Sequence, residues 1–412
     1  MDKIMIYADF DWLAAPELIG TLQHDRLRGA DKYGFEYANS WLQLHSDIIL
    51  SADIMNYPNL QWAGQGKEIF GCFSDAIPDR WGRTLVMRRE QLQAKQEQRP
   101  VKCLSSYDYL IGINDLTRMG ALRFKREGEE EYLNTENSLS VPPVADIREL
   151  LFASQEIEKS EEKNELPETK WLNQLLQPGS SLGGARPKAN VIDNGELYIA
   201  KFPSRKDNYN VELWEHLCHL LAKQAGIDVA ETKILKTGNK YHTLLSKRFD
   251  RKKGKRIHFA SAMTMLGLTD GEDANTGHGY LDIADFIIQN CINAETNLKQ
   301  LYRRIAFNIC IGNSDDHFRN HGFILTRKGW TLSPAYDINP TLNYYQGLLI
   351  DRNSNDANLD LLLHACEDYM IRKVDAIEII NEVKEAVGKW KNIAIRLQVP
   401  KSEMDMFEKR FR

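Results

Sequence analysis

The chain has 412 residues, of which 42% are hydrophobic and 27% charged, so it can bury a large core and is expected to form two or three domains or lobes. Its formal net charge of −5 gives no global attraction to nucleic acid, which argues against autonomous DNA binding. The six cysteines lie far apart without a CxxC pair, which predicts buried free thiols in a reducing cytosol and argues against a structural metal site.

The first seventy residues carry strand-like patterns separated by polar breaks. The expected strands are residues 4–8, 18–23, 34–38 and 47–50. These patterns predict a small β-rich domain. No long apolar core precedes Asp9, and no run of eighteen apolar residues occurs anywhere, so we expect neither secretion nor a membrane span.

A helix is expected from Pro78 to about residue 95, with Asp79 early in its first turn. Two later stretches, residues 126–131 and 156–168, are rich in charge and are expected to be solvated or mobile connections. We place a domain boundary near residues 125–145.

Residues 180–188 read Ser-Ser-Leu-Gly-Gly-Ala-Arg-Pro-Lys. The glycines Gly183 and Gly184 allow the backbone to approach a phosphate closely, and the N–H groups of the loop, including that of Ala185, could line it. The stretch matches neither the Walker pattern nor the kinase Gly-x-Gly-x-x-Gly pattern. A plain turn is therefore the alternative interpretation.

The residues after this loop predict a hairpin, with strands at 189–192 and 197–202 around the turn signal Asp-Asn-Gly. Lys201 thus lies on a strand directly after a Gly-containing loop. In protein kinases such a lysine holds the α- and β-phosphates of ATP, and an acid on the next helix holds the lysine. A helix is expected over residues 210–225, where Glu212 and Glu215 are both candidates for that acid. The alternative is a solvent-facing lysine.

Two further strands, 232–235 and 242–248, complete the order loop, hairpin, helix, hairpin, which is that of a kinase small lobe. Residues 246–250 then occupy the place of the hinge between the lobes. There the backbone around Lys247 and Phe249 would exchange hydrogen bonds with adenine.

Beyond residue 257 the pattern becomes helical. The expected helices are residues 257–267, 281–293, 298–311, 358–370, 374–389 and 403–411. The whole chain therefore predicts an α+β, two-lobed protein-kinase-like fold, with a small β-rich lobe, a helical large lobe and an amino-terminal β-rich subdomain.

The helix at 298–311 leads into the polar sequence Asn-Ser-Asp-Asp-His-Phe-Arg-Asn at residues 313–320. Kinase-like enzymes need a carboxylate at the attacking hydroxyl, an Asn five residues later for one metal ion and a second Asp for another. Asp315 and Asn320 have this spacing, and Asp337 follows a predicted hairpin. Asp316 is the competing carboxylate, although it lacks the five-residue offset and is expected to serve the turn of the loop or to face solvent. A polar loop capping a helix is the alternative without chemistry.

Taken together, these motifs resemble the HipA-type serine/threonine kinases, the toxins of bacterial toxin–antitoxin modules, over nearly the whole chain. The most specific segments are residues 70–83, 181–188, 247–251, 256–267, 312–320 and 333–340.

The resemblance implies that Asp315 is the catalytic base and that His317 supports the catalytic loop. It also implies that Asn320 and Asp337 bind Mg²⁺ and that Lys201 binds the phosphates of ATP.

Ser181 falls on the serine that the family autophosphorylates, with Ser180 as the neighbouring alternative. The amino-terminal subdomain would contact a dimeric helix-turn-helix antitoxin of the HipB type, so that DNA is bound only through the antitoxin.

We therefore expect an amino-terminal subdomain at residues 1–125, a kinase small lobe with the phosphate loop at 145–250 and a helical large lobe at 251–412. The leading hypothesis is a cytoplasmic protein kinase that uses ATP and Mg²⁺ to phosphorylate a protein substrate. Two alternatives stay open: a small-molecule kinase, and a co-repressor that only bridges an antitoxin on DNA.

Overall fold

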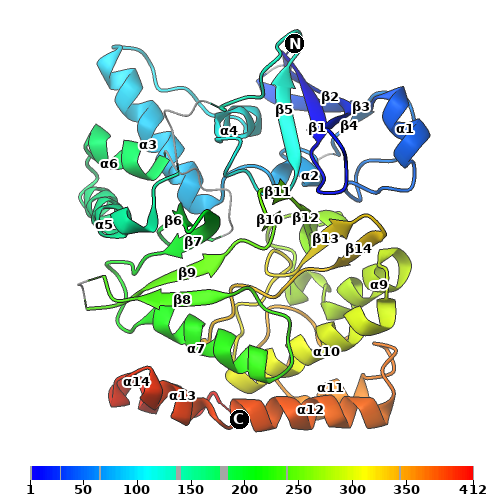
Figure 1. The fold of residues 1–412 in the computed structure, drawn as a ribbon, viewed down its shortest axis with the longest axis vertical. Helices are drawn as coiled ribbons and strands as arrows, with labels where there is room; N and C mark the ends of the chain where they lie inside the picture. The colour runs from blue at the N-terminus through cyan, green and yellow to red at the C-terminus, as the bar shows by residue number, and fades with distance from the viewer. Residues whose placement is uncertain are drawn as a thin grey trace. The chain divides into compact units, whose positions relative to one another are not determined.

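The computed structural model describes residues 2–27, 29–64, 66–135, 141–176, 184–237, 240–342 and 345–411. The chain forms two compact units (Figure 1). The first unit holds Met1–Lys206 and Asp250–Ala260, and the second holds Asp207–Phe249 and Ser261–Arg412. Within the described ranges, no helix combines the length and the apolar character needed to cross a membrane.

The first unit contains a five-stranded antiparallel sheet, in the order β4-β3-β2-β1-β5. Its strands are β1 (Asp2–Ala8), β2 (Glu17–Leu27), β3 (Ala30–Tyr37), β4 (Gln61–Trp62) and β5 (Leu122–Arg126). Alternate residues of β1 are buried, as a sheet with one covered face requires. Aromatic rings pack on one another beneath it, with Phe73 in contact with Phe35, Phe70 and Phe124. Three of the four predicted strands are confirmed. The strand predicted at 47–50 is wrong, because these residues form no strand and follow a helix.

Six α-helices accompany this sheet in the described part of the first unit. They are α1 (Asn39–His45), α2 (Gly71–Ser74), α3 (Arg80–Gln96), α4 (Ser106–Gly112), α5 (Ile147–Glu162) and α6 (Thr169–Leu176). Helix α6 packs against both α3 and α5 (Figure 1). The prediction of a solvated connection from residue 156 is wrong as far as Glu162, because α5 continues there and buries Ile157. The charge density of this stretch concealed a helix with one apolar face.

The predicted hairpin around Asn194 and Gly195 is confirmed as β6 (Lys188–Asp193) and β7 (Glu196–Lys201). Both turn residues have positive φ, at 50° and 77°, the conformation that a two-residue hairpin turn demands. The last strands of the first unit are β10 (Arg251–Lys252), β11 (Lys255–Arg256) and most of β12 (His258–Ser261). A strand therefore replaces the first part of the helix predicted over 257–267.

The second unit begins with helix α7 and a hairpin, all predicted to within two residues. Its helices are α7 (Val211–Gln224), α8 (Ala262–Met265), α9 (Tyr280–Asn290), α10 (Ala294–Ile311), α11 (Leu359–His364), α12 (Lys373–Val387), α13 (Trp390–Arg396) and α14 (Lys401–Phe407). Its strands are β8 (Thr232–Leu235), β9 (Thr243–Lys247), β13 (Gly322–Thr326) and β14 (Gly329–Leu332). Among the described residues there are also two short 3₁₀ helices, Val144–Asp146 in the first unit and Ala274–Thr276 in the second.

The core of the second unit lies around α10, which is buried over most of its length and packs against α9 and α12. The final helices, orange to red in Figure 1, close over α7. There the ring of Trp214 contacts Trp390, Phe407 and Phe411, and its indole N–H donates to the carboxylate of Glu403 at 2.9 Å.

The cysteines are free, as expected. Four of them are buried, whereas Cys103 is exposed and Cys291 lies between these extremes.

The indole hydrogen bond gives a test of this packing. The variant Trp214→Phe keeps an aromatic ring but leaves Oε2 of the buried Glu403 carboxylate without its donor, while Oε1 still accepts the N–H of Asn210 at 3.3 Å. It should therefore lower the free energy of unfolding by about 2 kcal/mol. The matched control is Trp390→Phe, because its indole N–H donates to no residue in the described ranges. Denaturant unfolding of both variants measures the difference, and equal losses would contradict the role of the hydrogen bond.

Candidate active site

The candidate site is presented by the loop that follows α10. The helix ends at Gly312, whose φ of 69° is left-handed, the usual way for a glycine to end a helix. The loop turns back onto the helix, because the side-chain amide of Asn313 donates to the side-chain oxygen of Asn308 at 3.1 Å. Ser314 is tied down in turn, since its backbone N–H donates to the hydroxyl of Thr341 at 3.2 Å.

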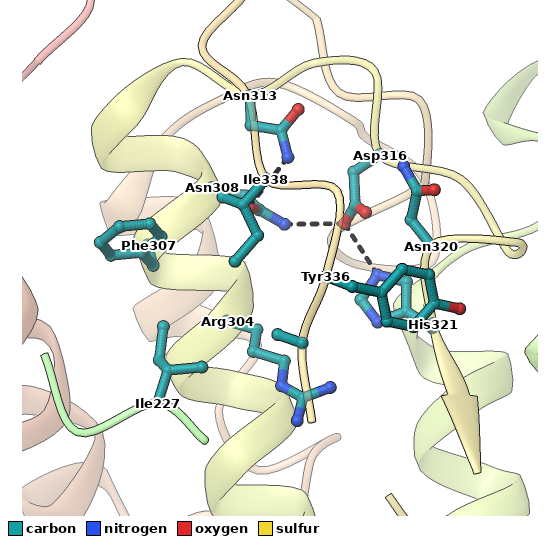
Figure 2. A pocket seen from close by; sticks show the side chains of 11 residues that line it. Ile227, Arg304, Phe307, Asn308, Asn313, Asp316, Asn320, His321, Tyr336 and Ile338 are labelled. Atoms are coloured by element: carbon teal, nitrogen blue, oxygen red, sulfur yellow. Dashed lines mark hydrogen bonds and ion pairs between the residues drawn. The ribbon is translucent and has the colours of Figure 1, made fainter. Parts of the chain in front are cut away.

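Asp316 is the buried anchor of this loop, with a residue exposure of 3%. A single carboxylate oxygen, Oδ2, accepts three hydrogen bonds. The donors are the hydroxyl of Tyr280 at 2.6 Å, the side-chain amide of Asn308 at 2.7 Å and ring nitrogen Nε2 of His321 at 2.8 Å. Figure 2 shows the contacts from Asn308 and His321. Burial alone raises the pKa of the Asp316 carboxyl, but His321 and Tyr280 favour its charged form, so that the pKa lies below its usual value.

Asp315, the neighbouring residue, is exposed. Its backbone carbonyl accepts a hydrogen bond from the side-chain amide of Asn320 at 3.0 Å, which holds these two residues of the predicted motif together. The pKa of the Asp315 carboxyl is raised, first by partial desolvation and then by the charges of Asp337 and Asp316, against the opposing effect of His317. The carboxylate of Asp337 therefore lies close enough to act on that of Asp315.

Asp337 has a left-handed backbone, with a φ of 57°, which is uncommon for a residue other than glycine. The segment that carries it is fixed at two points. The guanidinium of Arg304 donates to the carbonyl of Ser333 at 2.6 Å, and the hydroxyl of Tyr336 donates to the carbonyl of Arg319 at 2.7 Å. Backbone strain of this kind persists where the surroundings enforce it, and it is concentrated at functional sites.

A small pocket lies behind the loop, lined by residues of α10, the loop and the segment before Asp337 (Figure 2). Arg304, Asp316, Asn320 and His321 are among its lining residues. Burial lowers the pKa of Arg304 to about 10, and the nearby acidic groups oppose this effect.

A glycine allows a second segment to pack onto the loop from outside. A Cβ on Gly347 would lie 2.5 Å from the carbonyl oxygen of Asp316, closer than side-chain carbons come to such an oxygen. The same segment is tied to the 3₁₀ helix, since Ala274 donates its N–H to the carbonyl of Gly347 at 2.9 Å.

The predicted metal ligands suit Mg²⁺. This ion prefers oxygen ligands, and Asn320 and Asp337 supply an amide and a carboxylate. The raised pKa of Asp315 comes first from partial desolvation and then from the negative charges of Asp337 and Asp316, which a divalent cation would offset. Among the described residues there is no separate cluster of three or more His, Cys, Asp or Glu side chains suited to a metal.

Two other predicted site residues belong to the second unit. Lys247 ends β9, where its N–H donates to the carbonyl of Glu231 at 2.8 Å. The ring of Phe249 contacts that of Tyr336, with 5.6 Å between the centroids, next to Asp337 in the sequence.

The predicted phosphate-binding residues belong to the first unit. Lys201 ends β7, opposite Lys188 at the start of β6. Gly184 and Ala185 are exposed. Ser180, Ser181 and Gly183 lie outside the described residues.

The sequence motif did not reveal which histidine anchors the loop. The side chain of His317 is exposed, and its backbone carbonyl accepts the N–H of Asn320 at 2.8 Å. The buried histidine is His321, which the motif did not include. Tyr280 was missed for lack of a local signal. Asn308 did leave one, since it is a polar residue on a helix turn that is otherwise apolar.

Comparisons with known proteins identify the family of the chain. The family model of the HipA-like C-terminal domain matches residues 180–390, and that of the HipA N-terminal domain matches residues 12–107. The serine/threonine-protein kinase toxin HipA of Shewanella oneidensis is 24% identical over 350 residues, which are 78% of this chain and 72% of the toxin. A protein of Haemophilus influenzae is 29% identical over 181 residues, which are 39% of this chain. The chain spans about half, 52%, of that relative.

A solved structure covers almost the whole chain. It comes from the complex of HipA, HipB and operator DNA of the Shewanella oneidensis toxin–antitoxin system. The match covers 99% of this chain and 95% of that chain, with a TM-score of 0.65 and 18% identity. At this identity the likeness shows the fold. The predicted α+β kinase-like fold with an amino-terminal β-rich subdomain is therefore confirmed.

The hydrogen bond from Tyr280 to Asp316 should be worth more than one to a neutral group. We expect Tyr280→Phe to lower the free energy of unfolding by about 1.5–3 kcal/mol. Tyr302→Phe is the matched control, because this buried hydroxyl donates to a neutral carbonyl, that of Leu362, at 2.9 Å. Its loss should cost only about 1 kcal/mol. Equal losses in denaturant unfolding would argue against a charged Asp316.

Asp315 should destabilise the fold when it is charged. Because its pKa is higher in the folded chain than in the unfolded chain, the folded state disfavours the carboxylate, and stability is lost as the pH rises through the raised pKa. Asp315→Asn should therefore melt at a higher temperature than the wild type at pH 7. The gain should shrink as the pH falls toward the ordinary aspartate value of about 4. Thermal melts without nucleotide or metal test this, and a variant less stable than the wild type at pH 7 would contradict it.

Proposed function

The chain belongs to the family of the HipA-like C-terminal domain, and on this premise we propose that it is an ATP- and Mg²⁺-dependent serine/threonine-protein kinase. One observation carries the proposal. Two neighbouring carboxylates have opposite environments, with Asp316 buried under three donors and Asp315 exposed beside Asn320 and within the electrostatic reach of Asp337. The buried carboxylate holds the loop, which leaves the exposed one available for chemistry.

In the proposed reaction, the substrate hydroxyl gives its proton to the carboxylate of Asp315 while its oxygen attacks the γ-phosphorus of ATP. The bond between that phosphorus and the bridging oxygen of ADP breaks. The raised pKa of Asp315 suits this step, because it makes the carboxylate a better proton acceptor than an ordinary aspartate. Asn320 and Asp337 would hold Mg²⁺, which neutralises phosphate charge when it is bound.

The remaining predicted residues would bind the nucleotide. Lys201 would neutralise the α- and β-phosphates, and Gly184 and Ala185 would follow the phosphates with their backbone, together with Gly183. The backbone around Lys247 and Phe249 would hold adenine. This assignment treats residues 145–250 as the small lobe, 251–412 as the large lobe and 1–125 as the amino-terminal subdomain.

We place autophosphorylation at Ser181, with Ser180 as the alternative acceptor. In the sequence, Ser181 follows the charged stretch at residues 156–168 and comes just before Gly183 and Gly184 of the proposed phosphate loop. A phosphorylated serine there would add about two negative charges to a loop whose role is to hold phosphate, which would oppose ATP binding.

The proposed partner is a helix-turn-helix antitoxin of the HipB type, with DNA bound only through it and with the cytoplasm as the place of action. The matched solved structure is described together with HipB and operator DNA. In the first unit, the large apolar side chains of Met55, Tyr57 and Trp62 are 62%, 43% and 53% exposed, within eight residues of one another. Large apolar side chains exposed so near one another in the sequence favour a protein-binding surface on this segment.

Intact mass after incubation with Mg-ATP tests the kinase activity. We expect wild-type protein, first treated with a phosphatase, to gain the mass of one phosphoryl group, and peptide mapping to place it on Ser181. Asp315→Asn should lose at least about a hundredfold in rate, the usual contribution of a positioned general base. Ser181→Ala should gain no mass.

The control is Asp405→Asn, which removes an exposed carboxylate from α14, away from the loop, and should react like the wild type. A rate for Asp315→Asn within about threefold of the wild type would exclude this residue as the base. A phosphoryl group mapped to Ser180 would support the kinase activity and show that Ser180, instead of Ser181, is the acceptor.

A further inference from the structure

The first unit contains a buried ion pair that the proposed function does not use. The ammonium of Lys188 lies 2.9 Å from Oδ2 of Asp79, and the two side chains are only 4% and 2% exposed. Oδ1 of Asp79 caps helix α3 by accepting the N–H of Gly82 at 2.7 Å. The two ends of the pair are 109 residues apart in the sequence, so the carboxylate joins the start of a helix to the end of the proposed phosphate loop.

Trp81 adds two contacts to the same segment. Its indole N–H donates to the carbonyl of Lys188 at 3.1 Å, and its backbone N–H donates to the carbonyl of Gly184 at 3.3 Å. Residues 184 and 188 are thus each tied to the first turn of α3.

Gly184 fits this arrangement because it has no side chain. Its φ of 114° lies in the region that favours glycine, and a Cβ there would lie 3.1 Å from the ammonium of Lys188. The loop backbone therefore passes over the ion pair at close range. The pair sets the distance between the loop and helix α3.

The ion pair also constrains the position of Lys201, the lysine predicted to bind ATP. Lys188 is the first residue of β6 and is paired across the ladder with Lys201, the last residue of β7. Displacing Lys188 would therefore shift the strand end that carries Lys201.

The energetics favour a positioning role over a gain in stability. Burying two charges costs nearly as much as their attraction returns, whereas removing one partner leaves the other charge buried and uncompensated. Such a pair tolerates only a narrow range of geometries. Its presence at a loop is therefore better explained by the position it enforces.

We propose that Asp79 and Trp81, both in the amino-terminal region, are positioning residues for the phosphate loop, acting on Gly184 and on Lys201 through Lys188. This inference rests on the proposed ATP-dependent function. It adds that the kinase part of the chain needs the start of α3 in order to bind nucleotide with full affinity.

Calorimetric titration with Mg-ATP tests the proposal on the full chain. We expect Asp79→Asn to weaken ATP binding about tenfold or more, because a loop displaced by a fraction of an ångström loses its phosphate contacts. Trp81→Phe keeps an aromatic ring but removes the indole hydrogen bond and part of the buried ring, and it should weaken binding about threefold. This second variant keeps the test decisive if Asp79→Asn fails to fold.

The matched control is Glu90→Gln on the same helix. The carboxylate of Glu90 is also largely buried and pairs with Arg99, and within the described part of the chain its hydrogen bonds go to Arg99 and Lys102 instead of the loop. We expect it to lower stability without changing ATP affinity by more than about twofold. If Asp79 had a purely structural role, Asp79→Asn would, like Glu90→Gln, lower stability and leave the ATP affinity nearly unchanged.

Lys188→Met shows whether Asp79 acts through the lysine. If it does, the double variant Asp79→Asn/Lys188→Met binds ATP no more weakly than Lys188→Met alone. Additive losses would overturn this part of the proposal.

Hydrogen exchange supplies a readout without nucleotide. The amides of residues 184–190 should exchange about tenfold faster in Asp79→Asn than in Glu90→Gln. Wild-type protein that binds no ATP would overturn the proposed function, and the exchange rates would still test the positioning. Wild-type affinity and exchange in Asp79→Asn would overturn this inference and leave the kinase proposal standing.

Discussion

The candidate site depends on one buried charge, the carboxylate of Asp316. A charge with 3% exposure persists only where donors replace the water it has lost, and here the donors come from three separate elements. Tyr280 stands at the start of α9, Asn308 in α10, and His321 directly before β13. Holding all three against one oxygen fixes the loop between α10 and β13. The backbone alternation then directs Asp315 outward, so that one of two adjacent acids serves structure and the other is left for chemistry.

In the first unit, a buried charge again holds a loop in position. There the pair of Asp79 and Lys188 ties the start of α3 to the segment that begins with Gly184. In both places a loop with a proposed chemical role is held by a buried charge whose partners come from distant parts of the chain. Loops tolerate exposed functional groups because their supports lie on rigid elements. The exposed residues then keep their chemical freedom without losing their position.

Much of the fold was predictable because its signals are local. Asn194 and Gly195 predict their hairpin through the φ values that only such residues accept readily, and the apolar stripe of α10 predicts a buried helix. Secondary-structure predictions made from composition were wrong where burial in the tertiary structure determined the conformation. The charged end of α5 is helical because Ile157 lies on a covered face, and residue 258 begins a strand because of tertiary pairing.

The candidate site likewise has residues that local sequence signals predict and residues that they do not. Asp315, Asn320 and Asp337 could be predicted as candidates because their spacing is itself a motif. Their supports were not found, since Tyr280 is 36 residues from Asp316 and Asp79 is 109 residues from Lys188. No periodic pattern in the sequence can relate positions so far apart. Asn308 differs from the other supports, because a polar residue within an otherwise apolar helix turn is a local signal of a buried hydrogen-bond partner.

Asp315 is proposed to perform chemistry on a loop that it does not hold together. The most direct measurement follows ADP release and Mg-ATP binding side by side in the wild type and in Asp315→Asn. We expect equal nucleotide affinity, with ADP release lost in the variant. ADP release by the variant at the wild-type rate, or loss of nucleotide binding together with the fold, would contradict it.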